Sequence, residues 1–410
     1  MLTGGMTRLF HGWRMVAVCL IAALFANALG LFGAGVYLRQ LVEEKGWTTG
    51  LVSGAITLFY VVSAVLQIPV GGIIARFGPR PVFAAGTLAL CAGVAAIGRV
   101  EEPWQTYAAF LVMGVGWACL SMTAVATSLA PWFEKYQGRA VSIASLGASV
   151  GGIAGVPILL FGIAQAGFAA TTTVAAVVAL AVLLPLAWFV LKHRPQDIGL
   201  LPDGADARTA VAASAPARRW TRGEALRTAS LRSVMVAFGI GMLVQVGFVT
   251  HQVTMLAPVL GAAGTSATIS ATAVAALVSR LLLSRFADQI DARVTTACVL
   301  VCAAAALAAI GLWPSAGVMV TASVLFGATI GNVTTLSPIV VRREFGAASF
   351  GTLFGVASCA IQLATGVGPS FYGLLHDAFG GYRVPLLLAA AMDLVAVGAI
   401  LAGRSRKPAT

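Results

Sequence analysis

The sequence predicts an all-α membrane protein with about twelve transmembrane helices, from its composition, its length and its succession of apolar runs. Hydrophobic residues make up 59% of the 410 positions and charged residues only 10%, against roughly 25% charged residues in a soluble domain. The mean hydropathy is +0.93. No soluble core could cover this much apolar surface, so lipid must surround much of the chain.

Six apolar runs fill the first half of the chain, and charged residues, glycine or proline bound each of them. A bilayer core of about 30 Å is crossed by about 20 helical residues, so each run is long enough to span it. The first run is too long for a cleavable signal peptide, and another span follows it after a short polar loop. The predicted spans are 14–38, 50–74, 80–98, 104–130, 138–162 and 169–192.

A polar stretch then interrupts the pattern, with prolines, aspartates and the basic run Arg218-Arg219-Trp220-Thr221-Arg222. Six further apolar runs follow it, at 231–259, 264–287, 293–312, 314–341, 347–371 and 381–403. We therefore expect three parts, which are an N-terminal six-helix bundle at 1–192, a cytoplasmic linker at 193–230 and a C-terminal six-helix bundle at 231–410.

The formal charge of +12 follows the expected topology and does not indicate a patch for nucleic acid. Of the 26 lysines and arginines, four lie in alternate loops on one side of the membrane, one lies inside a span, and 21 lie on the opposite side or at its edge. Cytoplasmic loops carry such an excess of basic residues. We predict a multi-pass protein of the inner membrane with both termini in the cytoplasm and no nucleic-acid partner.

No motif for a metal or a cofactor is found. The six cysteines lie in apolar stretches without CxxC or Cys/His spacing, which is typical of small hydrophobic residues at helix contacts. A Walker loop and a Ser/His/Asp set with readable spacing are also absent, so neither direct use of ATP nor catalysis is expected. We predict a monomer in the lipid bilayer that needs no cofactor.

The two predicted halves resemble each other at a single offset of 213 residues. At this offset Gly114 aligns with Gly327, and Gln67 aligns with Arg280. Because one ungapped offset covers the second to sixth helices, we infer two six-helix halves that arose by duplication and are related by pseudo-two-fold symmetry. Parallel six-span halves around a midplane cavity describe the major facilitator architecture.

The loop after the second predicted span resembles the loop signature of the major facilitator superfamily. It reads Gly72-Ile-Ile-Ala-Arg76-Phe-Gly78-Pro-Arg80, with Ala75 where the family usually has aspartate, and the copy after the eighth span keeps its aspartate. The resemblance implies a lock between helices on the cytoplasmic face. Ordinary short loops with cytoplasmic positive charge are the alternative. The gate residues implied by the resemblance are Arg76, Arg80, Asp288 and Arg293.

Further segments resemble the monocarboxylate transporter branch and bacterial oxalate:formate antiporters. The stretch 131–152 has an aromatic pair, a lysine and then a helix rich in glycine and alanine, like the fifth helix of that branch. The opening His11-Gly12-Trp13-Arg14 and the segment Ser279-Arg280-Leu281 fit the same group. The resemblance covers nearly the whole chain. It implies transport of a small organic anion, with the eighth-helix arginine as the anchor of the substrate carboxylate.

Arg280 stands alone in a long apolar run, eight residues before Asp288. We expect Asp288 to mark the cytoplasmic edge of the bilayer core. Eight helical residues extend about 12 Å, and the core is about 30 Å thick, so Arg280 is predicted to lie near the middle of the bilayer. An arginine at this depth costs at least about 2.5–3.5 kcal/mol, so it must face a polar cavity or a partner. Its planar fork matches a carboxylate. We predict that Arg280 binds the substrate, and an ion pair with Asp393 is the alternative.

Polar groups in other spans are further candidates. His251 titrates near physiological pH, so we consider it for substrate binding and for proton coupling. Asp393 is the second proton-coupling candidate, because an acid within lipid is paired or protonated. Asn27 is the strongest polar group of the first span, where animal monocarboxylate transporters carry a lysine. The remaining substrate-binding candidates are Ser121, Asn332 and Gln362, which also suit helix packing.

The predicted function is secondary active transport of a small monocarboxylate by alternating access, with a co-transported proton as the expected drive. Exchange for another anion is one alternative. Proton-driven efflux of another metabolite or of a drug is a second, but it predicts an acid in the N-terminal cavity, and none is found there. A carboxylate receptor that signals through 193–230 is a third, although this stretch is short.

Overall fold

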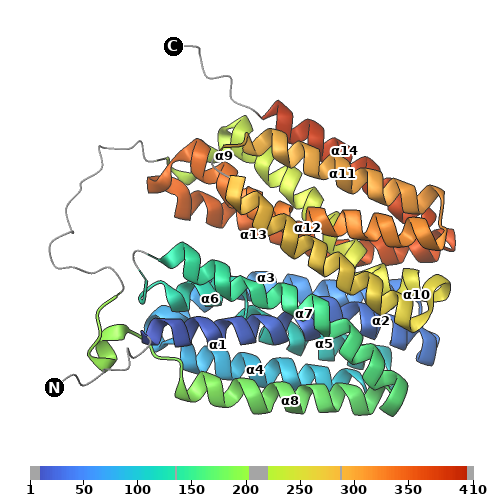
Figure 1. Cartoon of the computed structure of the whole chain (residues 1–410), viewed down its shortest axis with the longest axis horizontal. Coiled ribbons are helices and arrows are strands. Elements are labelled where there is room, and N and C mark those ends of the chain that lie inside the picture. The colour runs from blue at the N-terminus through green and yellow to red at the C-terminus, as the bar shows by residue number, and fades with distance from the viewer. Residues whose placement is uncertain (1–9, 134–135, 203–219, 287–288, 404–410) are drawn as a thin grey trace, which may run out of the picture.

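The computed structural model describes residues 10–133, 136–202, 220–286 and 289–403, and almost all of them are helical (Figure 1). The first half comprises α1 (His11–Ala26), η1 (Asn27–Leu31), α2 (Phe32–Lys45), α3 (Thr49–Phe77), α4 (Pro79–Ile97), α5 (Pro103–Cys119), α6 (Met122–Leu129), α7 (Gln137–Ala166) and α8 (Phe168–Phe189). Two short helices follow, η2 (Pro195–Ile198) and α9 (Arg222–Arg227). The second half comprises α10 (Ala229–Phe286), α11 (Ala292–Leu312), α12 (Ala316–Phe345), α13 (Ala347–Phe379) and α14 (Arg383–Ala402).

Eleven continuous helical stretches among the described residues are long and apolar enough to cross a membrane, and α10 contains two spans. Its 58 residues would extend about 87 Å as one straight helix, nearly three times the bilayer core. Gly261 breaks the helix with a positive φ of 66°. Gln252 and Thr272, on either side of the break, are joined by a side-chain hydrogen bond of 3.2 Å. The two parts form an antiparallel hairpin, so the predicted twelve-span all-α fold is confirmed.

Two of the predicted spans contain an irregular turn. The first span runs without interruption from His11 to Lys45, but residues 27–31 form a π-helical turn that begins at Asn27. Such turns often occur at functional sites. The fourth span is divided into α5 and α6, because the Ser121 side chain accepts a hydrogen bond from the amide of Ala124 and starts a new helix.

Equivalent glycines form equivalent contacts in the two halves, which confirms the pseudo-two-fold relationship. Gly114 of α5 lies against the backbone of Phe59 in α3, and Gly327 of α12 lies against the backbone of Thr272 in α10. Both members of the first pair precede those of the second by 213 residues. A side chain at either glycine would push the paired helices apart, so the repeat preserves close helix packing.

The two halves form two bundles that lie side by side (Figure 1). We call the end at which α8 ends and α10 begins the linker end, and the opposite end, where α2 meets α3, the far end. The bundles converge at the far end and diverge toward the linker end, which is on the left in Figure 1.

Candidate functional site

The far end is closed by contacts between α3 and α13, which belong to different halves. The hydroxyls of Thr57 and Ser370 are 2.8 Å apart, and the Ser370 amide donates to the Thr57 hydroxyl at 3.2 Å. In the first turn of α3, the Gly50 amide donates to the Asp377 carboxylate at 2.6 Å. Asp377 therefore caps the positive N-terminus of a helix from the other half.

His251 of α10 is buried within this closure and contacts both halves. Its Nε2 atom lies 3.0 Å from the carbonyl oxygen of Pro369 and 3.2 Å from the hydroxyl of Ser53 in α3. Its Nδ1 atom lies 3.0 Å from the hydroxyl of Tyr382. A carbonyl only accepts, so Nε2 carries a proton, and in the neutral ring Nδ1 accepts from the Tyr382 hydroxyl. The histidine thus joins α3, α10 and α13.

A second contact between the halves lies near the middle of α7, between α7 and α10. The Ser270 hydroxyl donates to the carbonyl oxygen of Ile153 at 2.7 Å. Gly152 lies next to it in α7, and a β-carbon there would be 3.1 Å from the side chain of Ala273. The hydrogen bonds named so far between the halves all lie at this level or nearer the far end, so the interface is closed at the far end.

Arg280 lies on the face of α10 that is turned toward the N-terminal half. It follows Ala273 by seven residues, or about two helical turns toward the linker end, and therefore shares its face. Its Nη2 atom is 3.4 Å from the hydroxyl of Thr334, and its Nε atom is buried without a hydrogen-bond partner among the described residues. The aliphatic stem packs against Gly331 of α12. The guanidinium thus retains unused donors on the linker side of the closure.

The alternative partner of Arg280, Asp393, does not bind it. The Asp393 side chain is 1% exposed, and both of its carboxylate oxygens are buried without a hydrogen-bond partner among the described residues. The ion pair that the sequence left open is therefore absent from this structure. The arginine and the acid are two separate polar groups within the C-terminal half.

Asn27 lies in the N-terminal wall at the level of the α7–α10 contact. Its side-chain amide donates to the carbonyl of Ala23 at 2.8 Å, and its β-carbon faces Gly151 of α7. This hydrogen bond fixes the Asn27 side chain at the start of the π-helical turn. Asn27 begins η1 beside α7 in the N-terminal half, whereas Arg280 belongs to α10 of the C-terminal half.

The other substrate-binding candidates are spread over different helices. The Asn332 amide donates to Ala328 at 3.1 Å, while its Oδ1 atom is buried without a described partner. It borders a hollow of about 310 Å³ between α10, α11 and α12. Gln362 is partly buried on α13, and Ser121 is occupied as the cap of α6. The structure therefore does not bring all predicted site residues together.

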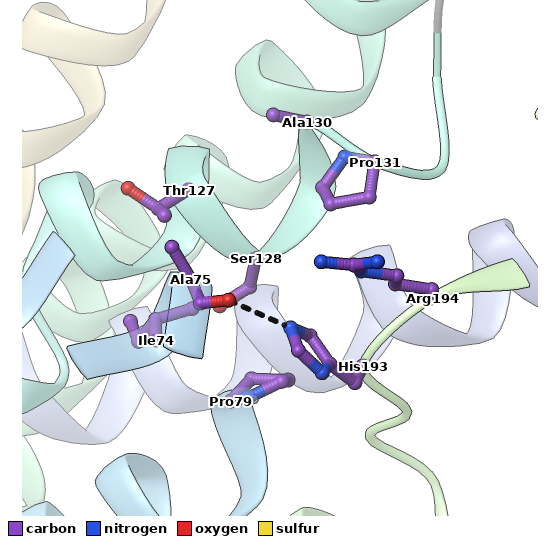
Figure 2. Close-up of a pocket in the computed structure, with 9 residues that line it drawn as sticks. All are labelled: Ile74, Ala75, Pro79, Thr127, Ser128, Ala130, Pro131, His193 and Arg194. Carbon is purple, nitrogen blue, oxygen red and sulfur yellow. Dashed lines mark hydrogen bonds between the residues drawn. The ribbon is translucent and has the colours of Figure 1, made fainter. Parts of the chain in front are cut away.

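A cavity of about 270 Å³ lies at the linker end of the N-terminal half, between the ends of α3 and α6 and the segment after α8 (Figure 2). The imidazole of His193 lies 3.1 Å from the carbonyl oxygen of Ala75 and donates to it. Ala75 occupies the place of the signature aspartate, and its main-chain carbonyl holds His193 at the end of α3. The Arg194 guanidinium lies beside Pro131 at the rim (Figure 2).

The predicted gate residues of the N-terminal half bind within that half. Arg76 is exposed, and its guanidinium lies 5.0 Å from the centre of the Phe77 ring. Arg80 donates from Nε to the carbonyl oxygen of Leu191 at the end of α8. Arg80 thereby ties the start of α4 to the end of the sixth span.

In the C-terminal half, Arg293 has an acid partner that the sequence analysis missed. Its guanidinium contacts both carboxylate oxygens of Glu344 in α12, at 2.5 and 2.9 Å. It also donates to the Ser233 hydroxyl at 2.9 Å and to the Ile400 carbonyl at 2.6 Å. This one side chain therefore joins α10, α11, α12 and α14. Asp288 lies outside the described residues.

The residues of the far-end closure were not predicted from the sequence. Ser53, Thr57 and Ser370 are small hydroxyl residues in apolar spans, and nothing in the sequence distinguishes them from packing residues. Asp377 follows the end of the eleventh predicted span and therefore looked like a loop residue. Glu344 did carry a signal, because it is an acid directly after the basic pair Arg342-Arg343 at the end of a span.

Residues 19–341 match the family described as the Major Facilitator Superfamily. Among curated proteins, the chain is 29% identical over 146 residues to "Uncharacterized MFS-type transporter YcxA" of Bacillus subtilis (strain 168), which is 35% of this chain and 36% of that protein. It is 30% identical over 118 residues to "Multidrug resistance protein MdtH" of Shigella dysenteriae serotype 1 (strain Sd197). That match covers 28% of this chain and 29% of MdtH, so the chain matches only about a third of the length of these relatives.

Solved structures share the fold over nearly the whole chain. A bacterial homologue of the human lysosomal transporter Spinster, in an inward-facing and unoccupied conformation, has a TM-score of 0.71 at 16% identity and covers 99% of this chain and 100% of its own. A mutant of the nucleoside transporter NupG has a TM-score of 0.72 at 10% identity and covers 96% of this chain and 100% of its own. At these identities the likeness concerns the fold alone.

Proposed function

This chain belongs to the major facilitator superfamily, and on this premise we propose that it is a secondary active transporter of a small organic anion, a monocarboxylate, and not an enzyme. The observation that carries the proposal is the state of Arg280. This cation lies within a span, faces the other half, and keeps a buried Nε donor without a partner among the described residues. A carboxylate is the ligand that a guanidinium fork binds in a bidentate manner.

The surroundings of Arg280 support a single bound anion. At the matching place in the other half, the Gln67 side chain accepts a hydrogen bond from Thr123 at 3.2 Å and carries no charge. One cationic anchor favours a monoanion over a dianion. Asn27 is the neutral donor that we propose for the opposite wall, and Asn332 and Gln362 are retained as further contacts of a bound substrate.

The closed far end supports transport by alternating access. We propose that the described conformation is the one open toward the linker end. In the topology that we propose, the linker 193–230 and both termini lie in the cytoplasm and the chain crosses the inner membrane as a monomer. The bundles 1–192 and 231–410 would then rock about the bound anion. Opening the far end requires breaking the contacts of His251 and Asp377, and the energy released by substrate binding would offset this loss.

A co-transported proton is the drive that we propose. His251 and Asp393 are titratable groups buried within the described spans, at 1% exposure each. Exchange for a second anion is the alternative within the same site. Anion exchange would need no titratable group, because the anion carried in the return direction would neutralise Arg280 as the substrate does.

Proton-driven efflux of a drug or another metabolite is a second candidate, favoured by the similarity to MdtH, a protein named for multidrug resistance. Efflux of a cationic drug would require an acid in the cavity. The described acids of the N-terminal half are Glu43, Glu44, Glu101 and Glu102, and they lie in the last turn of α2 or in the loop before α5, away from the interior of any span. The position of these acids favours an anionic cargo.

The test uses the full chain, purified and reconstituted in liposomes. Uptake of radiolabelled formate, acetate, L-lactate and pyruvate is measured with and without a pH gradient. We expect uptake of at least one of them, and its loss in Arg280→Ala. Arg99→Ala, an exposed loop arginine whose side chain donates to its own helix, is the matched control and should retain uptake. Undiminished uptake by Arg280→Ala would contradict the proposed anchor.

A further inference from the structure

Asp393 lies in the interior of the C-terminal half, near the middle of α14. Its side chain is 1% exposed, and neither carboxylate oxygen has a hydrogen-bond partner among the described residues. The buried residues that flank it in α14 are apolar, and they include Ala389, Ala390 and Ala396. An ionised carboxylate in this place would lose its hydration without compensation. The structure therefore accommodates Asp393 as a neutral, protonated acid.

The phenol of Tyr372 in α13 is the group that interacts with Asp393 electrostatically. Its ring packs against Gly247 of α10, where a β-carbon would lie 2.5 Å from a ring carbon. Its hydroxyl is buried and also has no hydrogen-bond partner among the described residues. An acid and a phenol are thus enclosed together, and the hydroxyl is a donor that an ionised Asp393 could use.

Few other ionisable groups lie on the helices packed around α14, which are α10, α11 and α13. Of the described side chains on these helices, Tyr372 interacts with Asp393 electrostatically, and Arg280 of α10 forms no ion pair with it. Arg293 of α11 reaches α14 at Ile400, about two turns nearer the linker end, and is neutralised by Glu344. His251 of α10 stacks on Tyr372. His376 and Asp377 follow Tyr372 by four and five residues in α13, toward the far end.

Tyr372 also connects Asp393 to the far-end closure. Its ring stacks on His251, with ring centres 5.7 Å apart and planes at 22°. His251 in turn contacts Ser53 of the N-terminal half and the carbonyl of Pro369, three residues before Tyr372 in α13. If Asp393 lost its proton, the carboxylate would attract the Tyr372 hydroxyl, and movement of this ring would disturb its contact with His251. The electrostatic interaction with Tyr372, and the contacts of Tyr372 and His251, therefore link the acid to the interface.

We propose that Asp393 and Tyr372 form a buried proton-binding site, separate from Arg280, and that a proton on Asp393 favours the closed far end through the contact between Tyr372 and His251. On release the proton passes to water, and the carboxylate accepts a hydrogen bond from the Tyr372 hydroxyl. The role of this site in driving transport rests on the proposed function, whereas its existence as a proton site does not.

Infrared spectroscopy of the reconstituted full chain tests the site without any substrate. A protonated carboxyl group gives a C=O stretching band that an ionised one lacks. We expect this band at neutral pH in the wild-type protein and its absence in Asp393→Asn. Glu101→Gln, which removes an exposed loop acid, is the control and should keep the band. A wild-type protein without the band, or a band that survives in Asp393→Asn, would overturn the proposal.

Tyr372→Phe provides a second variant that keeps the acid, in case Asp393→Asn does not fold. It removes the donor that an ionised Asp393 would use, so the neutral form is favoured and the band should persist to a higher pH than in the wild-type protein. An unchanged pH dependence would remove Tyr372 from the site. Because no anion is present, these results do not depend on the assignment of Arg280, and a failure of anion binding would leave them intact.

A disulfide across the interface tests the link to closure. Thr57→Cys and Ser370→Cys replace two hydroxyls that are 2.8 Å apart, in a background without the six native cysteines. With the far end locked shut by oxidation, the band should persist to a higher pH than in the same protein after reduction. Identical titrations in the oxidised and reduced proteins would show that Asp393 and the closure are independent.

Discussion

The carboxylate of Asp377 at the end of α13 accepts a hydrogen bond of 2.6 Å from the amide of Gly50 in the first turn of α3. A charge from one half thereby stabilises the helix N-terminus of the other half, and Gly50 permits the approach, because a β-carbon there would lie 2.8 Å from the carboxylate oxygen. This contact exists only while the far end is closed.

Asp377→Asn should raise the population of the open far end. Loss of a charge at a helix N-terminus costs up to about 1 kcal/mol, which is about a five-fold change in the equilibrium. Distances between spin labels on Lys45→Cys and Arg383→Cys, two exposed far-end positions in different halves, measure the change. Glu44→Gln removes an exposed acid at the same end and should have no effect. The same distance distribution in Asp377→Asn and the wild-type protein would remove this contact from the closure.

Arg280→Lys should bind a monocarboxylate at least about ten-fold more weakly than the wild-type protein, although the charge is kept. A lysine presents a point charge in place of the planar fork, and its shorter reach leaves Thr334 without its contact. The stabilisation of the purified protein by increasing pyruvate or L-lactate, followed as a rise in melting temperature, reports the affinity. Equal stabilisation of both proteins would show that the fork is not used.

Glu344→Gln should lower the free energy of unfolding by about 3 kcal/mol, because it leaves the buried Arg293 without its bidentate partner. Glu43→Gln breaks the exposed pair between Arg39 and Glu43 and should change the stability by less than about 1 kcal/mol. Melting curves of the two variants in one detergent give the comparison. If both variants melt alike, the ion pair between α11 and α12 does not hold the C-terminal half together.

Gly147→Ala should destabilise the N-terminal half by about 1–3 kcal/mol. A β-carbon there would overlap the carbonyl oxygen of Leu20, and α1 would have to move away from α7. Gly72→Ala in α3 meets no atom within 4 Å and should stabilise its helix by up to about 1 kcal/mol, because alanine is the better helix former. Melting temperatures that shift in the same direction would contradict the packing argument.

The ion pair of Arg293 with Glu344 could not be predicted from the sequence. The repeat aligns Arg80 with Arg293, and both arginines do reach a carbonyl near the end of the last span of their own half. Glu344, however, is 51 residues from Arg293, and only the packing of α12 against α11 brings them together. A pattern read along one helix carries no information on which other helix it meets.

The contacts of His251 also could not be predicted from the sequence. The sequence identified His251 as a polar group within a predicted span that titrates near physiological pH. Its partners Ser53, Pro369 and Tyr382 come from three other segments of the chain, up to 198 residues away. Whether such a histidine binds a substrate or joins two bundles depends on its neighbours, and these are set by the crossing of α3 and α13.

The sequence by itself determined the twelve spans, the two related halves and the isolation of Arg280, because lipid imposes helices of a fixed length and makes every internal charge conspicuous. Only the tertiary structure decided that Arg280 has no acid partner among the described residues, that Asp393 does not pair with it and interacts with Tyr372, and that Asp377 and His251 close the far end. These relationships depend on which helix faces cross one another, and contacts within a membrane are made by small and apolar residues whose pattern does not name a partner.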